Sequence, residues 1–285
     1  RGRGPRLLRV NHGEEALSIR VKYKVEQIGD IAIIKPPYGF NPDIKDAKAF
    51  AEELLSKLPV KAVWLAVGPV EGPYKTRELV HLAGEVRSET IYKEHGCYFK
   101  VDITKDFITP RLSFEHIRVA RLVSDDEVIV NMFAGVGTFS IIIAKHSKAR
   151  LIHSIDINPD AYAKMVENIR LNKVEDRVLP YLGDAANVIE SKLRGVADRV
   201  LMPLPDLAVP YFKHAVDAIH DEGYVHVYLH VHAGKGEVPE KRALEGFERG
   251  VRDVKVSWSV INSRVVRMVG PRFYQVVLDV KVKRA

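Results

Sequence analysis

The chain is poor in several residue types, and each scarcity excludes a class of protein. Its 285 residues include one cysteine, Cys97, so neither an internal disulfide nor a cysteine-rich zinc site can form. Glutamine occurs only as Gln27 and Gln275, which, with four methionines, is typical of thermophile proteins. No apolar run approaches the roughly 18 residues that span a membrane. We therefore expect a soluble, cytoplasmic protein that uses neither a metal nor a membrane.

The charge is unevenly distributed along the chain. The net charge is +7, and the excess lies at the two ends: the first ten residues hold four arginines and no acid, and the stretch from Arg264 to Arg284 is similarly basic. Such clusters are typical of nucleic-acid binding, but they also occur on the solvated surfaces of stable proteins. Both interpretations stay open at this level. Residues 1–25 show no clear period, and we expect a flexible basic lead-in or the remnant of a further module there.

Hydrophobic periodicity predicts two domains of different texture. A strand at 28–35, a helix at 46–58, a strand at 62–67 and short strands near 90–93 and 97–102 predict a small α+β domain over residues 26–110. From residue 111 to 285, strands and helices alternate, which favours a mostly parallel sheet covered on both faces. The last two strands, near 253–260 and 273–282, have no helix between them, so we expect an antiparallel hairpin at one edge of this α/β domain.

A glycine turn follows the first strand of the larger domain. Strand 128–131 leads into Gly135 and Gly137, which let the backbone turn sharply and approach a ligand closely. The next strand ends in Asp156, where a carboxylate can accept hydrogen bonds from ribose hydroxyls. Ser140 stands where a dinucleotide fingerprint has its third glycine, and no Gly-Lys-Ser/Thr follows to hold phosphates. These features favour a nucleoside without a pyrophosphate, namely S-adenosylmethionine.

A third strand end carries Gly183 and Asp184, within Leu179-Pro-Tyr-Leu-Gly-Asp-Ala185. We expect this pair to meet the adenine edge of the cofactor. Taken alone, an ordinary turn between strand and helix would explain it equally well. The order of three such turns along the chain favours the cofactor site.

Five segments together resemble a known enzyme family. They are Ile91-Tyr-Lys-Glu-His-Gly96, Thr109-Pro-Arg-Leu-Ser-Phe-Glu115, Asn131-Met-Phe-Ala-Gly-Val-Gly137, Ile155-Asp-Ile-Asn-Pro159 and Gly183-Asp184. They are similar to motifs of the archaeal and eukaryotic tRNA (guanine-N1)-methyltransferases, which act at position 37 beside the anticodon. The resemblance implies a class I (Rossmann-like) methyltransferase domain, a small RNA-contacting domain, S-adenosylmethionine as cofactor and tRNA as partner. We expect a monomer.

The resemblance also implies roles for particular residues. It makes Glu115 the general base, because guanine N1 carries a proton that must leave before its lone pair can be methylated. It also makes Arg77 the donor of a guanidinium to the target base, with Lys75 as the competing candidate. Without such a role, Arg77 would be an ordinary surface arginine, and Glu115 would be a helix carboxylate paired with Arg111 or Arg118. The expected cofactor-binding residues are Phe133, Ala134, Gly135, Val136, Gly137, Asp156, Ile157, Asp184, Ala185 and Pro203.

The chain departs from the family pattern at several positions. Pro203 stands where relatives have an asparagine, so recognition of the target base there falls to backbone carbonyls. Asn131 replaces a commoner aspartate, and Phe107 a frequent tyrosine. Two other functions therefore stay open: a wybutosine-pathway aminocarboxypropyl transferase acting on a tricyclic guanine, and a catalytically idle RNA-binding relative. We favour methyl transfer to guanine N1, because a base candidate and the basic charge occur together.

Overall fold

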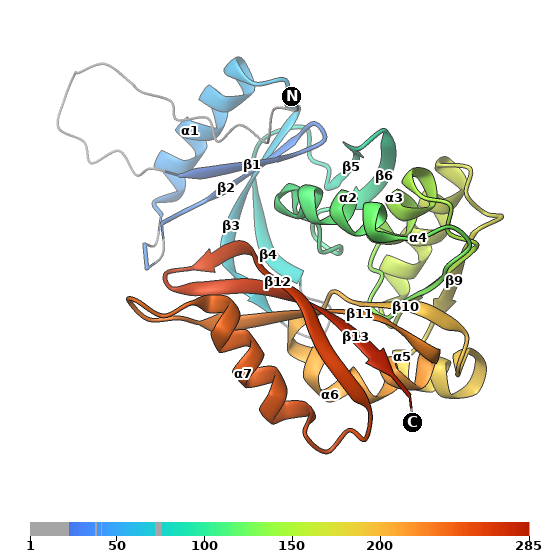
Figure 1. Ribbon diagram of the computed structural model, residues 1–285. Helices are drawn as coiled ribbons and strands as arrows, with labels where there is room; N and C mark the ends of the chain where they lie inside the picture. The colour runs from blue at the N-terminus through green and yellow to red at the C-terminus, as the bar shows by residue number, and fades with distance from the viewer. Residues whose placement is uncertain (1–22, 38, 41, 72–75, 285) are drawn as a thin grey trace. The chain divides into compact units, whose positions relative to one another are not determined.

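The chain folds into two compact units, Arg1–Arg111 and Leu112–Ala285. The computed structural model describes residues 23–284 except 38, 41 and 72–75, and the side chains of 69–71 and 76–77 are also left out. The arginines expected in a basic lead-in, and Lys75, lie outside the described residues. The two units are described separately below (Figure 1).

The first unit holds a four-stranded sheet and a hairpin. The sheet order is β1-β2-β3-β4, with β2 and β3 parallel across the connecting helix α1 and the other pairs antiparallel. Ala47, Ala51 and Leu54 form the buried stripe of α1 and pack on the sheet. The elements are β1 (Lys24–Ile28), β2 (Ile31–Lys35), α1 (Ile44–Lys57), β3 (Ala62–Glu71), β4 (Thr76–Gly84) and the hairpin β5 (Glu89–Glu94) with β6 (Cys97–Asp102).

The structure of this unit differs from the expected elements in two places. The predicted strand 28–35 is two strands, because Gly29, at φ +57°, turns the chain between β1 and β2. Strand β4 was not predicted. It begins with the polar run Thr76-Arg-Glu78, and most of its described side chains are only partly buried or exposed, so the alternation of apolar and polar residues is weak.

The second unit is built on a seven-stranded sheet in the order β12-β13-β11-β10-β7-β8-β9. Strands β9, β8, β7, β10 and β11 are parallel, whereas β13 runs antiparallel to both β11 and β12. The predicted fold, a mostly parallel sheet with an antiparallel C-terminal edge hairpin, is confirmed. The strands are β7 (Val128–Asn131), β8 (Leu151–Asp156), β9 (Val178–Leu182), β10 (Ala197–Met202), β11 (Ile219–His232), β12 (Ser257–Gly270) and β13 (Phe273–Lys283).

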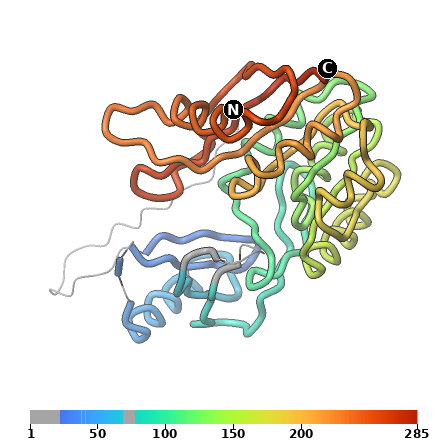
Figure 2. Tube along the Cα trace, turned by 90° about the horizontal axis from the view of Figure 1, so that it is seen from below, coloured from blue at the N-terminus to red at the C-terminus, as the bar shows by residue number. Residues whose placement is uncertain are grey.

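Helices cover both faces of this sheet. Helices α6 and α7 pack against β10, β11 and β13 on one face, along the lower side of the sheet in Figure 1, while α2 and α3 pack together on the other. Figure 2 shows α7 (orange-red) beside the C-terminal hairpin (red). The helices are α2 (Ser113–Leu122), α3 (Thr138–His146), α4 (Pro159–Leu171), α5 (Ala185–Val188), a π-helical turn (Ile189–Leu193), α6 (Pro205–Ala218) and α7 (Pro239–Val251).

Strand β11 shows how the two faces differ. Successive side chains of a strand point to opposite faces. Val225, Val227 and Leu229 are buried in the apolar cluster beneath α6 and α7. The alternate residues His226 and Tyr228 are buried too, but they hydrogen-bond to polar groups on the side of α2. One face of the sheet is therefore an apolar core, and the other carries a buried polar network.

Candidate active site

The predicted cofactor residues lie at the ends of four neighbouring strands and in the segments that directly follow them. Asn131 at the end of β7 pairs with Ser154 of β8 and with Leu201 of β10, and Asp156 pairs with Leu182 of β9. The carboxyl ends of parallel strands meet at one edge of a sheet, where open α/β folds bind their ligands. The register therefore gathers the predicted turns at this edge.

Asp156 holds the glycine turn in place. Its Oδ2 accepts a hydrogen bond from the backbone N–H of Gly135 at 2.7 Å, and its Oδ1 accepts one from Asn158 N–H at 2.9 Å. Burial raises the pKa of Asp156, and the backbone donors oppose that shift. Gly135 has φ +57°, and a Cβ there would meet nothing within 4 Å, so the turn is open on the side where a ligand can approach. Gly137, at φ +93°, precedes the first turn of α3.

Two apolar side chains are exposed at this edge. Ile157, directly after Asp156, is 54% exposed, and Leu182, at the end of β9, is 51% exposed. Large aliphatic groups left in water next to a hydrogen-bonding carboxylate suit a planar, apolar ring such as adenine. By contrast, the side chains of Ala134, Val136 and Ala185 are buried, so these predicted residues can meet a ligand only through their backbone.

Asp184 has a partner that the sequence did not indicate. It caps α5 by accepting from Asn187 N–H, and its other oxygen accepts a 2.6 Å hydrogen bond from the hydroxyl of Tyr211 on α6. This bond raises the pKa of Tyr211. The Tyr211 ring also meets Phe133 edge-on, with centroids 5.7 Å apart. Tyr211 thus joins two predicted cofactor residues, but no local motif marks it, because the contact spans 27 positions.

Glu115 is buried on the polar face of the sheet, with 1% of its surface exposed. Arg118, one turn further along α2, donates to both carboxylate oxygens, and the Tyr228 hydroxyl donates to Oε1 at 2.7 Å. Arg264 of β12 donates to Oε2. In the sheet, Val277 of β13 pairs with Tyr228 of β11 and with Arg264 of β12. Tyr228 directly follows Val227, which pairs with Met202, the last residue of β10. Glu115 therefore lies level with the turn that follows β10.

A buried polar network extends from Glu115 along the same face. Arg118 also donates to Asp279 at 2.7 and 3.0 Å, and Asp279 accepts from His226 Nδ1 at 2.6 Å. Arg199 donates to His226 Nε2 at 2.8 Å and forms a two-point ion pair with Glu127. Burial would raise the pKa of Asp279, but His226 and Arg118 outweigh it and hold that pKa well below its ordinary value. No local motif marks Asp279, His226 or Tyr228, and the sequence predicted no role for them.

The turn after β10 offers no polar side chain. It reads Met202-Pro-Leu-Pro205, with Met202 buried and Pro203 partly exposed, and Pro205 begins α6. Within these four residues, a target base with hydrogen-bond donors on its edge would meet only backbone carbonyls; the nearest acidic side chain is that of Asp206, exposed in the first turn of α6. Asn131 is fully buried beneath the neighbouring turn, where its amide donates to Ser140 Oγ at 3.1 Å. Its Oδ1 has no hydrogen-bond partner among the described residues.

Arg77 belongs to the first unit. It lies near the start of β4, where its backbone pairs with Val70. Its side chain lies outside the described part of the chain, and so does the competing Lys75. The expectation that a guanidinium at this position meets the target base therefore stays a prediction.

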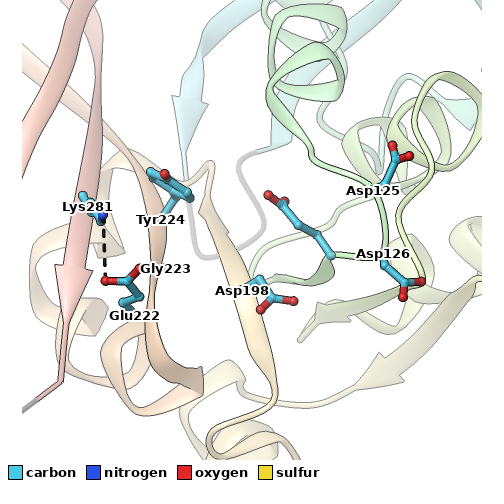
Figure 3. A pocket seen from close by; sticks show the side chains of 8 residues that line it. Asp125, Asp126, Asp198, Glu222, Gly223, Tyr224 and Lys281 are labelled. Carbon is cyan, nitrogen blue, oxygen red and sulfur yellow. Dashed lines mark ion pairs between the residues drawn. The ribbon is translucent and has the colours of Figure 1, made fainter.

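A separate pocket of about 270 Å³ opens at the amino-terminal edge of the sheet, opposite the predicted cofactor loops (Figure 3). Its lining is mostly acidic: Asp125, Asp126, Glu127, Asp198 and Glu222, with Gly223, Tyr224 and Lys281. An acidic lining disfavours an anionic ligand such as nucleic acid. This pocket is therefore a poor candidate for binding the expected RNA.

Two features are absent from the described residues. No helix among them is long and apolar enough to cross a membrane. No group of three or more histidine, cysteine, aspartate or glutamate side chains among them could hold a metal ion.

Comparison with known proteins identifies the family. Residues 90–259 match the TRM5/TYW2 methyltransferase domain. The chain belongs to the TRM5/TYW2 methyltransferase family. Taw21 of Saccharolobus solfataricus, named as a tRNA 4-demethylwyosine(37)-methyltransferase, is 42% identical over 90% of this chain and 93% of its own. Trm5b of Pyrococcus abyssi, a tRNA (guanine(37)-N(1))-methyltransferase, is 40% identical over 90% of this chain and 73% of its own.

Solved structures agree with this assignment. The complex of aTrm5 with tRNALeu matches with a TM-score of 0.79 and 35% identity, over 92% of this chain and 72% of that one. TYW2 of Methanocaldococcus jannaschii, solved with AdoMet, matches with a TM-score of 0.69 and 27% identity, over 92% of this chain and all of that one. S-adenosylmethionine, the predicted cofactor, is the cofactor of this family.

The residues predicted to bind the cofactor, at the carboxyl edge of the parallel strands, fit that molecule. The open side of Gly135, the fixed carboxylate of Asp156 and the exposed Ile157 and Leu182 match a nucleoside. The Oδ1 of Asn131, which has no hydrogen-bond partner in the described part of the chain, is an acceptor beneath the glycine turn. When bound, the cofactor supplies an electrophilic methyl group on a sulfonium.

Proposed function

We propose that this protein transfers a methyl group from S-adenosylmethionine to the purine at position 37 of tRNA, with N1 of guanine as the acceptor. The observation that carries the proposal is the position of Glu115, a carboxylate held level with the end of β10 beside the cofactor edge. Relatives that are 40% and 36% identical are named as guanine(37)-N(1) methyltransferases. Their named substrate is the reason for choosing tRNA.

The proposed chemistry needs a base and a positioned acceptor. Glu115 takes the proton from guanine N1, and the electron pair left on N1 forms the bond to the methyl carbon. The carbon–sulfur bond of the sulfonium breaks at the same time, with its electrons passing to sulfur. Arg118 and Tyr228 fix the direction of the carboxylate, so that the carboxylate itself need not turn when the acceptor arrives.

A specific observation favours a second acceptor, 4-demethylwyosine. Guanine presents N–H donors at N1 and at its exocyclic amine, whereas the tricyclic base has these nitrogens closed into its third ring. The turn Met202-Pro-Leu-Pro205 has no amide or hydroxyl side chain with which to accept from such donors. The similarity to Taw21 points the same way. Methylation of a ring carbon also releases a proton, so Glu115 retains a use in that reaction.

One experiment separates the two acceptors. The protein is incubated with labelled S-adenosylmethionine and either unmodified tRNA carrying guanine 37 or tRNA carrying 4-demethylwyosine, and the digested nucleosides are analysed by mass. We expect a 1-methylguanosine product from the first. Methylation of the tricyclic nucleoside alone would establish the second function, and transfer of an aminocarboxypropyl group would overturn both.

The base assignment has its own test. Glu115→Gln retains the size of the side chain but loses the ionised acceptor, so single-turnover transfer should fall by about 10²–10⁴-fold. Cofactor affinity should stay at the wild-type value. A variant that transfers methyl at the wild-type rate would remove Glu115 from the mechanism.

A further inference from the structure

Burial of Glu115 poses a problem that the proposed function must answer. With 1% of its surface exposed, the carboxylate cannot touch a nucleobase while all of its neighbours stay in place. Oε1 is covered by Arg118 and Tyr228, and Oε2 is covered by Arg118 and Arg264. A proton can reach Oε2 only when one of these partners moves away.

The neighbours differ in their freedom to move. Arg118 is held from its other side by Asp279, and Tyr228 is fully buried under α3, where its ring packs against Phe139. Arg264 belongs to the edge strand β12, and its side chain is 30% exposed, against 14% for Arg118. Arg264 is therefore the partner that can leave without taking apart the buried network.

The charge balance gives this departure a chemical consequence. The network contains three carboxylates, of Glu115, Asp279 and Glu127, and three guanidinium groups, of Arg118, Arg199 and Arg264. His226 adds no charge: because Arg199 can only donate to Nε2, the ring proton lies on Nδ1 and points to Asp279. Removal of Arg264 leaves one negative charge in excess beside Glu115, which favours proton uptake there.

Arg264 lies against a surface suited to a nucleotide. Its guanidinium carbon is 4.8 Å from the centroid of the Phe114 ring, and Phe114 is 61% exposed in the first turn of α2. An exposed aromatic ring beside a partly exposed guanidinium offers a stacking surface for a base and a donor for a phosphate.

We propose that Arg264 is a substrate-displaced latch: a backbone phosphate next to the acceptor nucleotide draws the guanidinium away from Glu115, uncovers Oε2 and leaves the carboxylate able to accept a proton. Phe114 then receives a neighbouring base. The proposal rests on the proposed role of Glu115 as the base. The groups that face Glu115 are Arg118 from α2, Tyr228 from β11 and Arg264 from β12, with Asp279 of β13 behind Arg118. Arg264 is the member of this set whose charge the substrate removes.

The first test uses Arg264→Ala and compares two pH profiles of single-turnover methyl transfer to guanine-37 tRNA. Rates at low tRNA concentration report groups of the free enzyme, and rates at saturating tRNA report the complex. If Arg264 is such a latch, it contacts Glu115 only in the free enzyme. At low tRNA, the pH at which the rate falls on the acid side of the profile (the acid limb) should therefore be higher by about one pH unit in the variant. At saturating tRNA, the acid limbs of the wild type and the variant should coincide.

Arg267→Ala provides the matched control, since Arg267 is on the same strand and bonds to Gln275. It should weaken tRNA binding and leave both acid limbs in place, and Arg264→Lys should restore the wild-type limb at low tRNA. Equal shifts in both profiles would show that Arg264 stays on Glu115 throughout catalysis. The absence of any shift would show that it does not govern the carboxylate. Either result overturns the latch.

A binding measurement tests the latch without methyl transfer. In Glu115→Gln the ion pair that retains Arg264 is lost, so this variant should bind tRNA several-fold more tightly than the wild type. Glu115→Gln with Arg264→Ala should bind as weakly as Arg264→Ala alone. Unchanged affinity of a folded Glu115→Gln protein refutes the latch. If that variant loses activity but binds tRNA like the wild type, the base assignment stands and only the latch fails. Should Glu115→Gln not fold, the Arg264→Ala profiles decide.

Discussion

Replacement of Asp279 by asparagine tests whether the polar face of the sheet is held together by charge. The Asp279 carboxylate is 3% exposed and accepts hydrogen bonds from Arg118, His226 and Asn262. Asparagine retains one acceptor oxygen and presents an amide donor to groups that are themselves donors. The variant leaves a buried positive charge in excess, and breaking a buried pair in this way costs about 3–5 kcal/mol. We expect the lower end, about 3 kcal/mol, because Arg118 retains Glu115.

The assay is urea unfolding at pH 7 followed by the fluorescence of Trp258, which packs against Phe247 in the second unit. Trp64, the other tryptophan, lies in the first unit and is replaced by phenylalanine in all variants. Asp125→Asn is the control, since its ion pair with Lys148 is mostly exposed and contributes less than about 1 kcal/mol. The reasoning would be refuted if Asp279→Asn lowered the free energy of unfolding by no more than Asp125→Asn does.

The pH dependence gives a second check on the same variant. The pKa of Asp279 is lowered in the folded state. Its contribution to the free energy of unfolding is therefore complete above the pKa of the unfolded state, about 4, and declines as the pH falls below that pKa. The stability difference between the wild type and Asp279→Asn should therefore be largest near pH 7 and narrow below about pH 4. The pKa of His226 is lowered by burial, so unfolding takes up a proton below about pH 6.5 in both proteins and their stabilities should fall together there.

Three further predictions concern other parts of the chain. Asp156→Ala should weaken S-adenosylmethionine binding by about 1–3 kcal/mol, measured by calorimetry, and unchanged affinity would place the cofactor elsewhere. Gly84→Ala should destabilise the first unit, because Gly84 has φ +82° and a Cβ would lie 2.2 Å from the Lys61 carbonyl oxygen, whereas Gly39→Ala, with a similar φ and open space, should lower the melting temperature less; equal effects would contradict this. Affinity for tRNA should fall by about one power of salt concentration per phosphate contact, and Arg267→Ala should reduce that slope by about one; a slope near zero would indicate a surface that is only solvated.

The sequence by itself determined the features that depend on neighbouring residues. The alternation of strands and helices after residue 111, the glycine turn at Gly135 and the acid at the end of the next strand are local patterns, and they predicted the fold and the cofactor family correctly. Alternation failed where a turn or a polar run weakened it, as at Gly29 and in β4. It also placed the next-to-last strand near 253–260, whereas β12 runs over Ser257–Gly270. Local pattern suffices for such features because hydrophobic period and backbone freedom act over a few residues.

The tertiary structure decided what surrounds Glu115. Its partners Tyr228 and Arg264 lie 113 and 149 positions away, and Arg118 meets Asp279 across 161. From sequence, Glu115 was a helix carboxylate that could face a ligand or an arginine of its own helix. Only the sheet register places β11, β12 and β13 side by side, so that alternate side chains project onto the face that α2 covers. Burial, which depends on that register, turns an ordinary carboxylate into one that a single arginine can cover or expose.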